Sequence, residues 1–424
     1  MKNWSLSNIF KGDKTIWMVF FLLCAISIVE VYSASSSLSY KGGNYWGPII
    51  KHSGTIFLGF LSMVVVMNIP CKYYKIVTLP LLIFAAITQV LVYKIGESTN
   101  DANRWMEIMG IQFQPSEFGK MALVLCCAQV LSALQKQDGA QPRAFWYIFW
   151  PSVIIIGLIA PENLSTAVLT GSTVFLMMFV GRVPLRLLGK FVGVILILVG
   201  LAIGSVMLFG HAEEKPSQKA ILTEVVQQEE PKEESSIEKL LHRMDTWKSR
   251  ILKFSDDTYI SPDDYDLDKD GQVAHANIAV ASSNIIGKGP GNSNERDFLS
   301  QAFSDFIYAI IIEEMGIGGA FFVAFLYVVL LFRAGKIANR CENSFPAFLA
   351  MGIAFLLVTQ ALFNMAVAVG LAPVTGQPLP LISKGGTSTI INCAYIGALL
   401  SISRFAQRRE DLKPANAKTE DIRA

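Results

Sequence analysis

Long apolar blocks are the feature that most restricts how this chain can fold. Residues 346–370 contain no charged side chain, and residues 189–210 contain only Lys190. A helix of about 20 predominantly apolar residues spans a bilayer, and in hydrocarbon the backbone must satisfy its own hydrogen bonds. With 424 residues, 52% of them hydrophobic and 17% charged, the chain is too apolar for a soluble domain of this size. We therefore predict an all-α, polytopic membrane protein.

About ten of these blocks are long enough to be transmembrane helices. They cover residues 15–34, 47–69, 76–94, 116–134, 145–160, 165–181, 189–210, 303–332, 346–370 and 385–404. The predicted organisation is seven spans within residues 1–210, a large loop over 211–302, three spans within 303–404 and a tail over 405–424. An even number of spans places both ends of the chain on one side of the membrane.

The Lys and Arg residues of the short connections indicate which side that is. On the side of the termini lie Lys2, Lys11, Lys14, Lys72, Lys75, Lys136, Arg143, Arg182, Arg186, Lys190, Arg333, Lys336, Arg340, Arg404, Arg408 and Arg409. The opposite short connections hold only Lys41, Lys51, Lys94, Arg104 and Lys384. Because cytoplasmic connections carry the excess of basic residues, both termini are predicted to be cytoplasmic and the large loop extracytoplasmic. Charge distributed in this way gives no support for nucleic-acid binding.

The large loop divides into two parts by composition. Residues 213–234 are rich in Glu, Lys, Gln and Pro and cannot bury enough apolar area to order themselves, so we expect disorder. Over residues 235–254 apolar side chains recur at helical spacing, which predicts an amphipathic helix on the outer surface. The run from Asp266 to Gly271 resembles the start of a calcium loop, but Asn277 stands where that loop requires an acid. An EF-hand is therefore not expected.

The eighth span has a carboxylate at its start and two more within it. Asp305 precedes an apolar run, and Glu313 and Glu314 follow further along. An acid in or beside hydrocarbon costs about 2.5 to 3.5 kcal/mol on insertion scales, so such residues usually face a protein interior, a wet cavity or a partner. Asp305 is therefore a candidate catalytic residue. In the alternative interpretation it only caps the helix that follows, and both glutamates are satisfied within the bundle.

The start of the fourth span combines an acid with a lysine. Pro115 and Glu117 suit the first turn of a helix, where proline is pre-organised and an acid meets the positive end of the helix dipole. Lys120 lies one turn further into the apolar helix and can pair with Glu117 on one face. It is either half of a structural ion pair or a cation that binds an anionic substrate. Arg104, beside Trp105 in the preceding connection, is a second candidate cation or a headgroup anchor.

The connection before the last span is unusual for a membrane protein. Residues 372–388 carry three prolines and a pair of adjacent glycines between apolar stretches. This pattern predicts a broken helix or a re-entrant segment, which a membrane protein tolerates only where protein or a water-filled cavity covers the backbone. Lys384 would stand at the edge of this segment, and Ser388 at its end.

These motifs together resemble the SEDS family of cell-wall proteins over nearly the whole chain. They are Asn103-Arg104-Trp105, Gln114 to Glu117 with Lys120, Leu164 to Ala167, Gly287 to Ser293, Ser304 to Ile307 with Glu313-Glu314, and Pro380 to Ser388. The run Gly289 to Ser293 favours the FtsW branch of that family over the RodA branch. Asn163 stands where the family usually has Asp, and the acidic stretch 213–234 is longer than the family leads us to expect. A role for the acid of that turn does not carry over to this chain.

The resemblance implies a peptidoglycan glycosyltransferase that polymerises lipid II at the outer face of the bacterial cytoplasmic membrane, at the division septum. Glycosyl transfer from a lipid pyrophosphate needs a base for the attacking hydroxyl and cations for the departing group. The matching residues are Asp305 as the catalytic acid–base group and Arg104, Glu117, Lys120, Lys384 and Ser388 in substrate binding. The implied partners are lipid II, a class B penicillin-binding protein that cross-links the product, other divisome proteins and membrane lipids.

Cofactors leave little trace in this sequence. The six cysteines show neither a disulfide framework nor the spacing of a metal site. A divalent cation, Mg²⁺ or Mn²⁺, could assist through Asp305 and the pyrophosphate, since hard cations need few dedicated protein ligands.

Three other functions remain open on the sequence alone. A lipid II flippase could use Glu313, Glu314 and Lys120 as charges at the membrane midplane, a RodA-like polymerase would act in elongation, and a divisome scaffold would need no chemistry. Transporter sites lie near the midplane between inverted repeats. The chain shows no convincing repeat and its charges cluster toward one face, so an enzyme is favoured.

Overall fold

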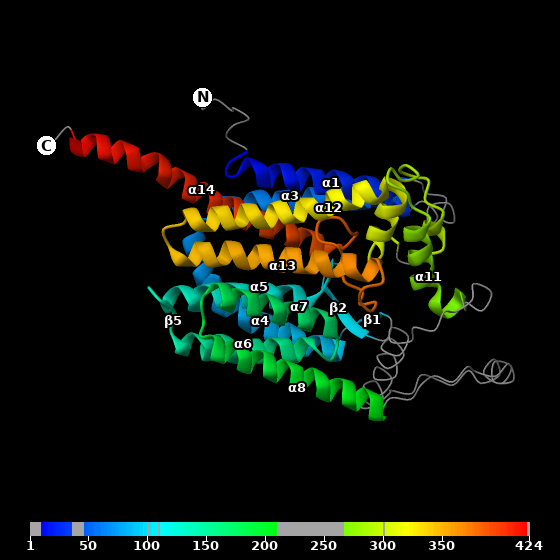
Figure 1. The fold of residues 1–424 in the computed structure, drawn as a ribbon, viewed down its shortest axis with the longest axis horizontal. Helices are drawn as coiled ribbons and strands as arrows, with labels where there is room; N and C mark the ends of the chain where they lie inside the picture. Colours follow the sequence, from blue (N-terminus) through cyan, green and yellow to red (C-terminus); the bar gives the residue numbers. More distant parts are fainter. Residues whose placement is uncertain are drawn as a thin grey trace.

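The computed structural model describes residues 10–35, 46–95, 97–99, 102–108, 111–209, 267–299 and 302–421. Long helices lie side by side in an elongated bundle (Figure 1). They are α1 (Lys14–Ala34), α3 (Gly47–Asn68), α4 (Tyr74–Ile95), α5 (Pro115–Ala133), α6 (Pro142–Ile159), α7 (Leu164–Val180), α8 (Leu185–Phe209), α12 (Ile307–Arg340), α13 (Ser344–Ala368) and α14 (Thr387–Asp421). Each of the ten predicted spans coincides with one of these helices.

The helices have the length and composition of membrane spans. Eight are long and apolar enough to cross a bilayer: α1, α3, α4 with the preceding turn η2 (Cys71–Tyr73), α5, α6, α12, α13 and the first part of α14. Helix α7 is a shorter apolar helix of 17 residues, and α8 has 25 residues. The predicted all-α membrane fold is confirmed.

Local sequence signals fix where several helices begin. Proline occupies the first turn of α5 and of α6, where its missing N–H is not needed. At the start of α1, the Asp13 carboxylate accepts hydrogen bonds from the backbone N–H groups of Thr15 and Ile16. The same carboxylate pairs with Arg333 of α12 at 2.6 Å, so one residue both caps α1 and ties it to α12.

Small residues allow α3 and α14 to pack closely. A Cβ atom added at Gly59 of α3 would lie 2.7 Å from the Cys393 sulfur, and one at Gly397 of α14 would lie 2.5 Å from the Met63 carbonyl oxygen. Both distances are shorter than van der Waals contact. Close helix approach at small residues is the usual source of packing energy between spans, because hydrocarbon supplies no hydrophobic driving force.

Helix α12 is broken at Gly316, which has φ 74° and ψ 179°. This conformation is essentially restricted to glycine. The backbone groups freed by the break are used by a loop before the helix: the N–H of Lys288 donates to Glu313 O, and the N–H of Gly318 donates to Ile285 O. The glycine-rich motif of the sequence, residues 287–293, is part of this loop and therefore has a structural role.

At the end of the bundle away from the start of α1, two structured regions were not predicted (Figure 1). A three-stranded antiparallel sheet, β1 (Glu97–Thr99), β2 (Ala102–Ile108) and β3 (Ile111–Phe113), occupies the connection before α5. Helix α11 (Leu267–Ala281) and the turn η4 (Glu295–Asp297) occupy the end of the large loop. The calcium-like run therefore lies mostly in a helix. The predicted disorder over 213–234 and the predicted helix over 235–254 fall outside the described residues.

The segment predicted to be a broken helix or a re-entrant segment forms neither helix nor strand over residues 369–386. It is nevertheless enclosed by protein, with Gln377, Leu379, Ile382 and Ser383 all buried. A short hairpin at the opposite end of the bundle, β4 (Gln135–Lys136) and β5 (Gly139–Ala140), completes the described fold.

Candidate active site

Asp305 lies in the turn immediately before α12 and is partly exposed. Its carboxylate accepts a hydrogen bond from Ser304 Oγ at 3.0 Å, and its backbone carbonyl accepts one from Asn364 Nδ2 at 2.9 Å. The N-cap position of α12 is occupied by Phe306, whose side chain makes no capping bond. Asp305 therefore lies one residue before the N-cap position.

The buried segment before α14 places Lys384 beside this turn. The Ser383 hydroxyl donates to the carbonyl of Ser304 at 2.6 Å, and the Lys384 N–H donates to the carbonyl of Phe303 at 3.0 Å. The Lys384 ammonium lies 4.6 Å from the centroid of the Phe303 ring, a cation–π distance. Partial burial and, secondly, the charge of Lys51 lower the pKa of Lys384. An anion bound beside Lys384 would therefore stabilise the charged form of its ammonium group.

The neighbouring spans satisfy the carbonyl groups of this segment. Asn364 Nδ2 donates to Gln377 O at 2.7 Å, and Gln360 Nε2 donates to Pro378 O at 3.0 Å. The Tyr327 hydroxyl donates to Pro380 O, and the Ser27 hydroxyl donates to Ile382 O at 2.6 Å. Irregular backbone within a membrane bundle requires such partners, since no water or regular structure replaces them. The segment is therefore held in one position beside Asp305.

Lys120 forms the predicted pair with Glu117, at 2.7 Å between Nζ and Oε1. Both side chains are almost fully buried, at 1% and 3% exposure. The ammonium also donates to Gln360 Oε1 at 2.9 Å. Because Gln360 in turn holds Pro378, the ion pair supports the segment that carries Lys384. A direct contact between Lys120 and a substrate would require the substrate to reach this enclosed pair.

Two amides of α13 connect the predicted residues and were missed in the sequence. Gln360 contacts Lys120, and Asn364, one turn further along the helix, contacts Asp305 and Gln377. Residues four positions apart lie on the same face of a helix. The sequence signal was two amide residues four positions apart in a span that has no charged side chain, because polar side chains are unusual within a membrane. The structure shows that both amides are buried.

Arg104 and Ser388 are the two remaining residues predicted to bind substrate. Arg104 lies on strand β2, and the description of the structure does not extend to its side chain. The sheet does reach the site, because Thr387 Oγ1 at the start of α14 donates to Gln112 O at 3.0 Å. The buried Ser388 hydroxyl donates to Gly385 O at 2.8 Å within its own turn. The structure therefore brings Asp305, Lys384 and Ser388 to one region, with Lys120 beneath it.

The turn with the unusual asparagine also packs on this segment. Asn163 is the N-cap of α7, and its Oδ1 accepts from the Thr166 N–H at 3.0 Å and from Gln377 Nε2 at 3.3 Å. The Thr166 hydroxyl accepts a second hydrogen bond from Gln377 at 2.7 Å. Asn163 therefore serves as a helix cap and as a support for the buried segment.

Glu313 and Glu314 form a separate cluster with different surroundings. Both are fully buried. Glu313 accepts from Lys288 Nζ at 2.6 Å, from the Asn294 N–H at 3.0 Å and from the Ser293 hydroxyl. Glu314 accepts from the Gly291 N–H at 3.0 Å and from the Ser33 hydroxyl. The interpretation in which these glutamates are satisfied inside the bundle agrees with this geometry.

Comparison with known proteins gives relatives of similar length. A family of cell cycle proteins comprising FtsW, RodA and SpoVE matches residues 13–408. A Geobacter sulfurreducens protein named probable peptidoglycan glycosyltransferase FtsW is 28% identical over 404 residues, which are 94% of this chain and 97% of the relative. The Escherichia coli K12 protein named peptidoglycan glycosyltransferase MrdB is 27% identical over 398 residues, 92% of this chain and 93% of the relative.

Solved structures share the fold. A chain from the structure reported as "Structural coordination of polymerization and crosslinking by a peptidoglycan synthase complex" has a TM-score of 0.64 at 23% identity and covers 94% of this chain and 99% of its own. The Thermus thermophilus rod shape determining protein RodA has a TM-score of 0.59 at 21% identity, with coverage of 94% and 98%. The family resemblance seen in the sequence motifs is confirmed: the chain belongs to the family of cell cycle proteins that comprises FtsW, RodA and SpoVE.

Proposed function

We propose that the protein is a peptidoglycan glycosyltransferase that polymerises lipid II, with Asp305 as its catalytic carboxylate. The names of its relatives support the activity. The observation that carries the site assignment is the contact between two distant segments, in which Ser383 and Lys384 bond the backbone of Phe303 and Ser304. This contact holds the backbone of Lys384 against the turn that contains the partly exposed Asp305.

The chemistry requires the proton of the attacking sugar hydroxyl to be removed while negative charge develops on the departing pyrophosphate. Asp305 is the group proposed to take that proton. Lys384 is proposed to bind the pyrophosphate, together with Arg104 from strand β2. Lys120, with Glu117, is a further proposed contact for the pyrophosphate, and the same pair would keep Lys384 in place through Gln360. Ser388 is proposed to bind substrate at the start of α14.

A divalent cation fits this site only with the help of the substrate. The described part of the chain contains no group of three or more His, Cys, Asp or Glu side chains that could hold a metal ion. Asp305 and the pyrophosphate oxygens would together hold such an ion, which when bound would neutralise charge on the leaving group.

The activity can be tested with purified protein and lipid II. Protein in detergent or nanodiscs, with and without a class B penicillin-binding protein, should convert lipid II into a ladder of glycan polymer on a gel. A partner of this class is proposed because a structural neighbour is part of a complex that couples polymerisation to cross-linking. Absence of polymer in both preparations, with folded protein and intact lipid II, would contradict the proposed activity.

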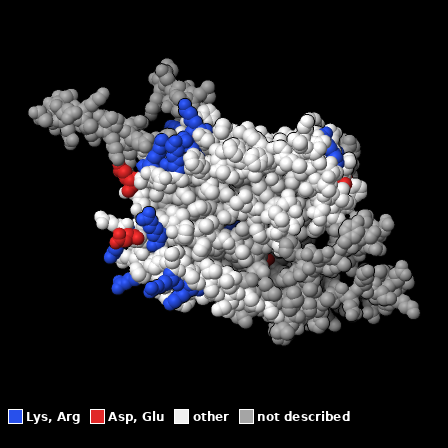
Figure 2. Space-filling model, viewed as in Figure 1, with Lys and Arg blue, Asp and Glu red and all other residues white. Residues whose placement is uncertain are grey.

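The proposed orientation places both termini in the cytoplasm. Figure 2 shows most of the visible Lys and Arg side chains at the end of the bundle where α1 begins, which is the arrangement expected of a cytoplasmic face. A cysteine at Ser235, in the loop proposed to be periplasmic, should react with a membrane-impermeant reagent when only the outer membrane is permeabilised. Reaction only after lysis of the inner membrane would reverse this orientation.

The proposed cellular role is septal synthesis. The family includes proteins of both division and elongation, and the relatives carry both kinds of name. Depletion of a division polymerase should give filaments, whereas depletion of an elongation polymerase should give round cells. Round cells after depletion would assign the protein to elongation and leave the enzymatic proposal intact.

A further inference from the structure

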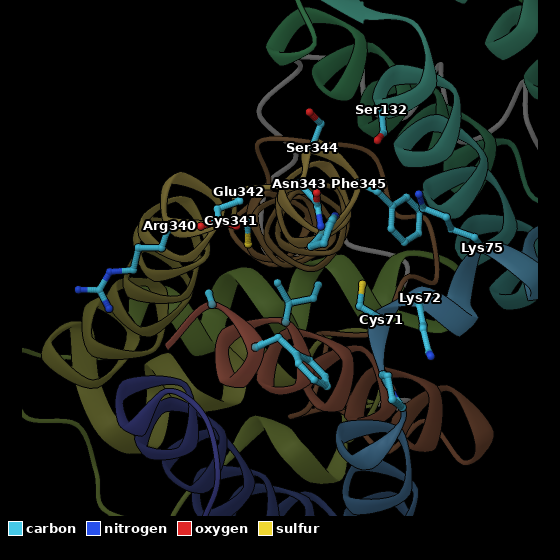
Figure 3. Close-up of a pocket in the computed structure, with 15 residues that line it drawn as sticks. Cys71, Lys72, Lys75, Ser132, Arg340, Cys341, Glu342, Asn343, Ser344 and Phe345 are labelled. Carbon is cyan, nitrogen blue, oxygen red and sulfur yellow. The ribbon is translucent and has the colours of Figure 1, made fainter. Parts of the chain in front are cut away.

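A cavity of about 750 Å³ lies at the far end of the bundle from Asp305, and the proposed activity does not use it. Its lining comes from η2, α4, α5, α14 and the junction between α12 and α13 (Figure 3). Arg340, which lines the cavity, is the last residue of α12, and Asp305 precedes the first. The part of α12 after its break at Gly316, residues 317–340, is by itself about 36 Å long. The cavity and the proposed active site therefore lie near opposite membrane faces.

The cavity is rich in positive charge. Lys72, Lys75 and Arg340 line it, from three different elements, against the single lining carboxylate of Glu342. Lys72 and Lys75 are exposed, and neither pairs with a carboxylate among the described residues. Their ammonium groups can therefore bind an anion that enters the cavity.

Aromatic rings and a helix terminus position this charge. The Lys75 ammonium lies 4.9 Å from the centroid of the Phe345 ring, at the wall of the cavity (Figure 3). Phe345 belongs to the first turn of α13, which contains no acidic residue, and its N-cap Asn343 makes no side-chain capping bond. The positive end of the α13 dipole therefore adds to the lysines on the same cavity.

The remaining lining is apolar, and the cavity lies where the spans end. Pro70, Pro346, Ile402 and Phe405 contribute to its walls. A ligand that matches it has an anionic group for the basic rim and apolar parts for these walls. A phospholipid in the adjacent leaflet has both, at this depth in the membrane, and basic pockets between spans are known sites for anionic headgroups.

We propose that this cavity binds the phosphodiester headgroup of an anionic glycerophospholipid, with Lys72 and Lys75 as its principal ligands. The ordinary excess of basic residues at a cytoplasmic face gives diffuse attraction to anionic lipid. A built cavity that brings together a helix terminus and two lysines, neither paired with a carboxylate of the described residues, gives in addition a specific and saturable site. The proposal is independent of the proposed enzymatic function.

The test compares two variants that lose the same charge at the same end of the bundle. Lys72→Gln/Lys75→Gln removes the cavity lysines, and Arg186→Gln/Lys190→Gln removes two exposed charges of α8 that do not line the cavity. Full-length protein is placed in nanodiscs of phosphatidylcholine with a minor fraction of phosphatidylglycerol. Native mass spectrometry after release from the nanodiscs counts the phosphatidylglycerol retained, and thermal melting confirms folding.

The expected result is retention of one phosphatidylglycerol by the wild type and by the α8 variant. The cavity variant should lose about fivefold in apparent affinity for each lysine removed, at about 1 kcal/mol per basic residue near a charged surface. Equal retention by the two variants would overturn the proposal. Displacement of the lipid by glycerol 3-phosphate at comparable concentration would also overturn it, because the ligand would then be a soluble phosphate ester. Because these side chains are exposed, the variants should fold.

Discussion

Asp305, just before α12, and the pair Glu313 and Glu314, within it, differ in what surrounds them. Glu313 and Glu314 are fully buried, and lysine, serine and backbone N–H groups from a glycine-rich loop bond their oxygens. Asp305, only two turns earlier, is partly exposed and lies in a turn against Lys384 and the segment before α14. A carboxylate whose oxygens are enclosed by fixed donors has little capacity to exchange a proton with a substrate. This difference in burial and in hydrogen-bond partners distinguishes the acids that stabilise the fold from the acid proposed to be catalytic.

The largest effect on the structural cluster is expected from Gly316→Ala. Its Cβ would collide with the Ile285 carbonyl oxygen and lie 2.5 Å from the Gly287 nitrogen, and its φ is unfavourable for alanine. Backbone strain and overpacking together should cost at least about 4 kcal/mol. Gly335→Ala, in the same helix with nothing closer than 3.9 Å, should be neutral or stabilising. Equal melting temperatures of the two variants would show that the break in α12 is not required.

Lys120→Met tests the pair that lies beneath the proposed active site. Removing one partner of a buried ion pair strands the other charge, at a cost of about 3 to 5 kcal/mol. The double variant Lys120→Met/Glu117→Gln removes the stranded charge and should recover most of that stability. If Lys120 binds the pyrophosphate or keeps Lys384 in place through Gln360, lipid II turnover by the double variant stays low. Full turnover would show that Lys120 contributes only to stability.

Lys288→Met should weaken the glutamate cluster by a smaller amount. Lys288 is 25% exposed while Glu313 is fully buried, so the loss should be about 2 to 3 kcal/mol, below that of a fully buried pair. Turnover per folded molecule should be unchanged, because Lys288 does not contact the turn of Asp305. Exposed Lys190→Met serves as the control for charge removal. A loss of turnover without a loss of stability would place the glutamate cluster in the catalytic machinery.

The smallest effect is expected at the cap of α7. Asn and Asp are equally good N-caps, so Asn163→Asp should change the free energy of unfolding by less than about 0.5 kcal/mol, whereas Asn163→Ala should cost about 1 kcal/mol. The alanine variant also loses a contact with Gln377. Denaturant or thermal unfolding of the two variants distinguishes them. A large effect of Asn163→Asp would show that the family's usual acid has a role beyond capping.

The spans were predictable because every helix that crosses the hydrocarbon needs about 20 predominantly apolar residues. Ten apolar blocks gave ten helices, and the Glu117–Lys120 pair followed from helical spacing alone. The residues that assemble the site were harder, because their partners are remote: Lys120 lies 240 positions from Gln360, and Ser383 lies 79 from Ser304. No local pattern specifies such contacts. Strands β1 to β3 and helix α11 were missed because short elements outside the membrane lack a strong periodic signal.

The central claim is that Asp305 does chemistry while Glu313 holds the fold, and one paired measurement tests it directly. Asp305→Asn, Glu313→Gln and the exposed control Asp297→Asn each exchange an acid for its amide, and each purified variant is measured for thermal stability and for polymerisation of lipid II per folded molecule. Asp305→Asn should melt near the wild type and lose about 10²-fold to 10⁴-fold in polymerisation, since an amide cannot act as a general base. Glu313→Gln should melt lower and polymerise normally when folded, and Asp297→Asn should change neither. Near-normal polymerisation by Asp305→Asn would contradict the assignment.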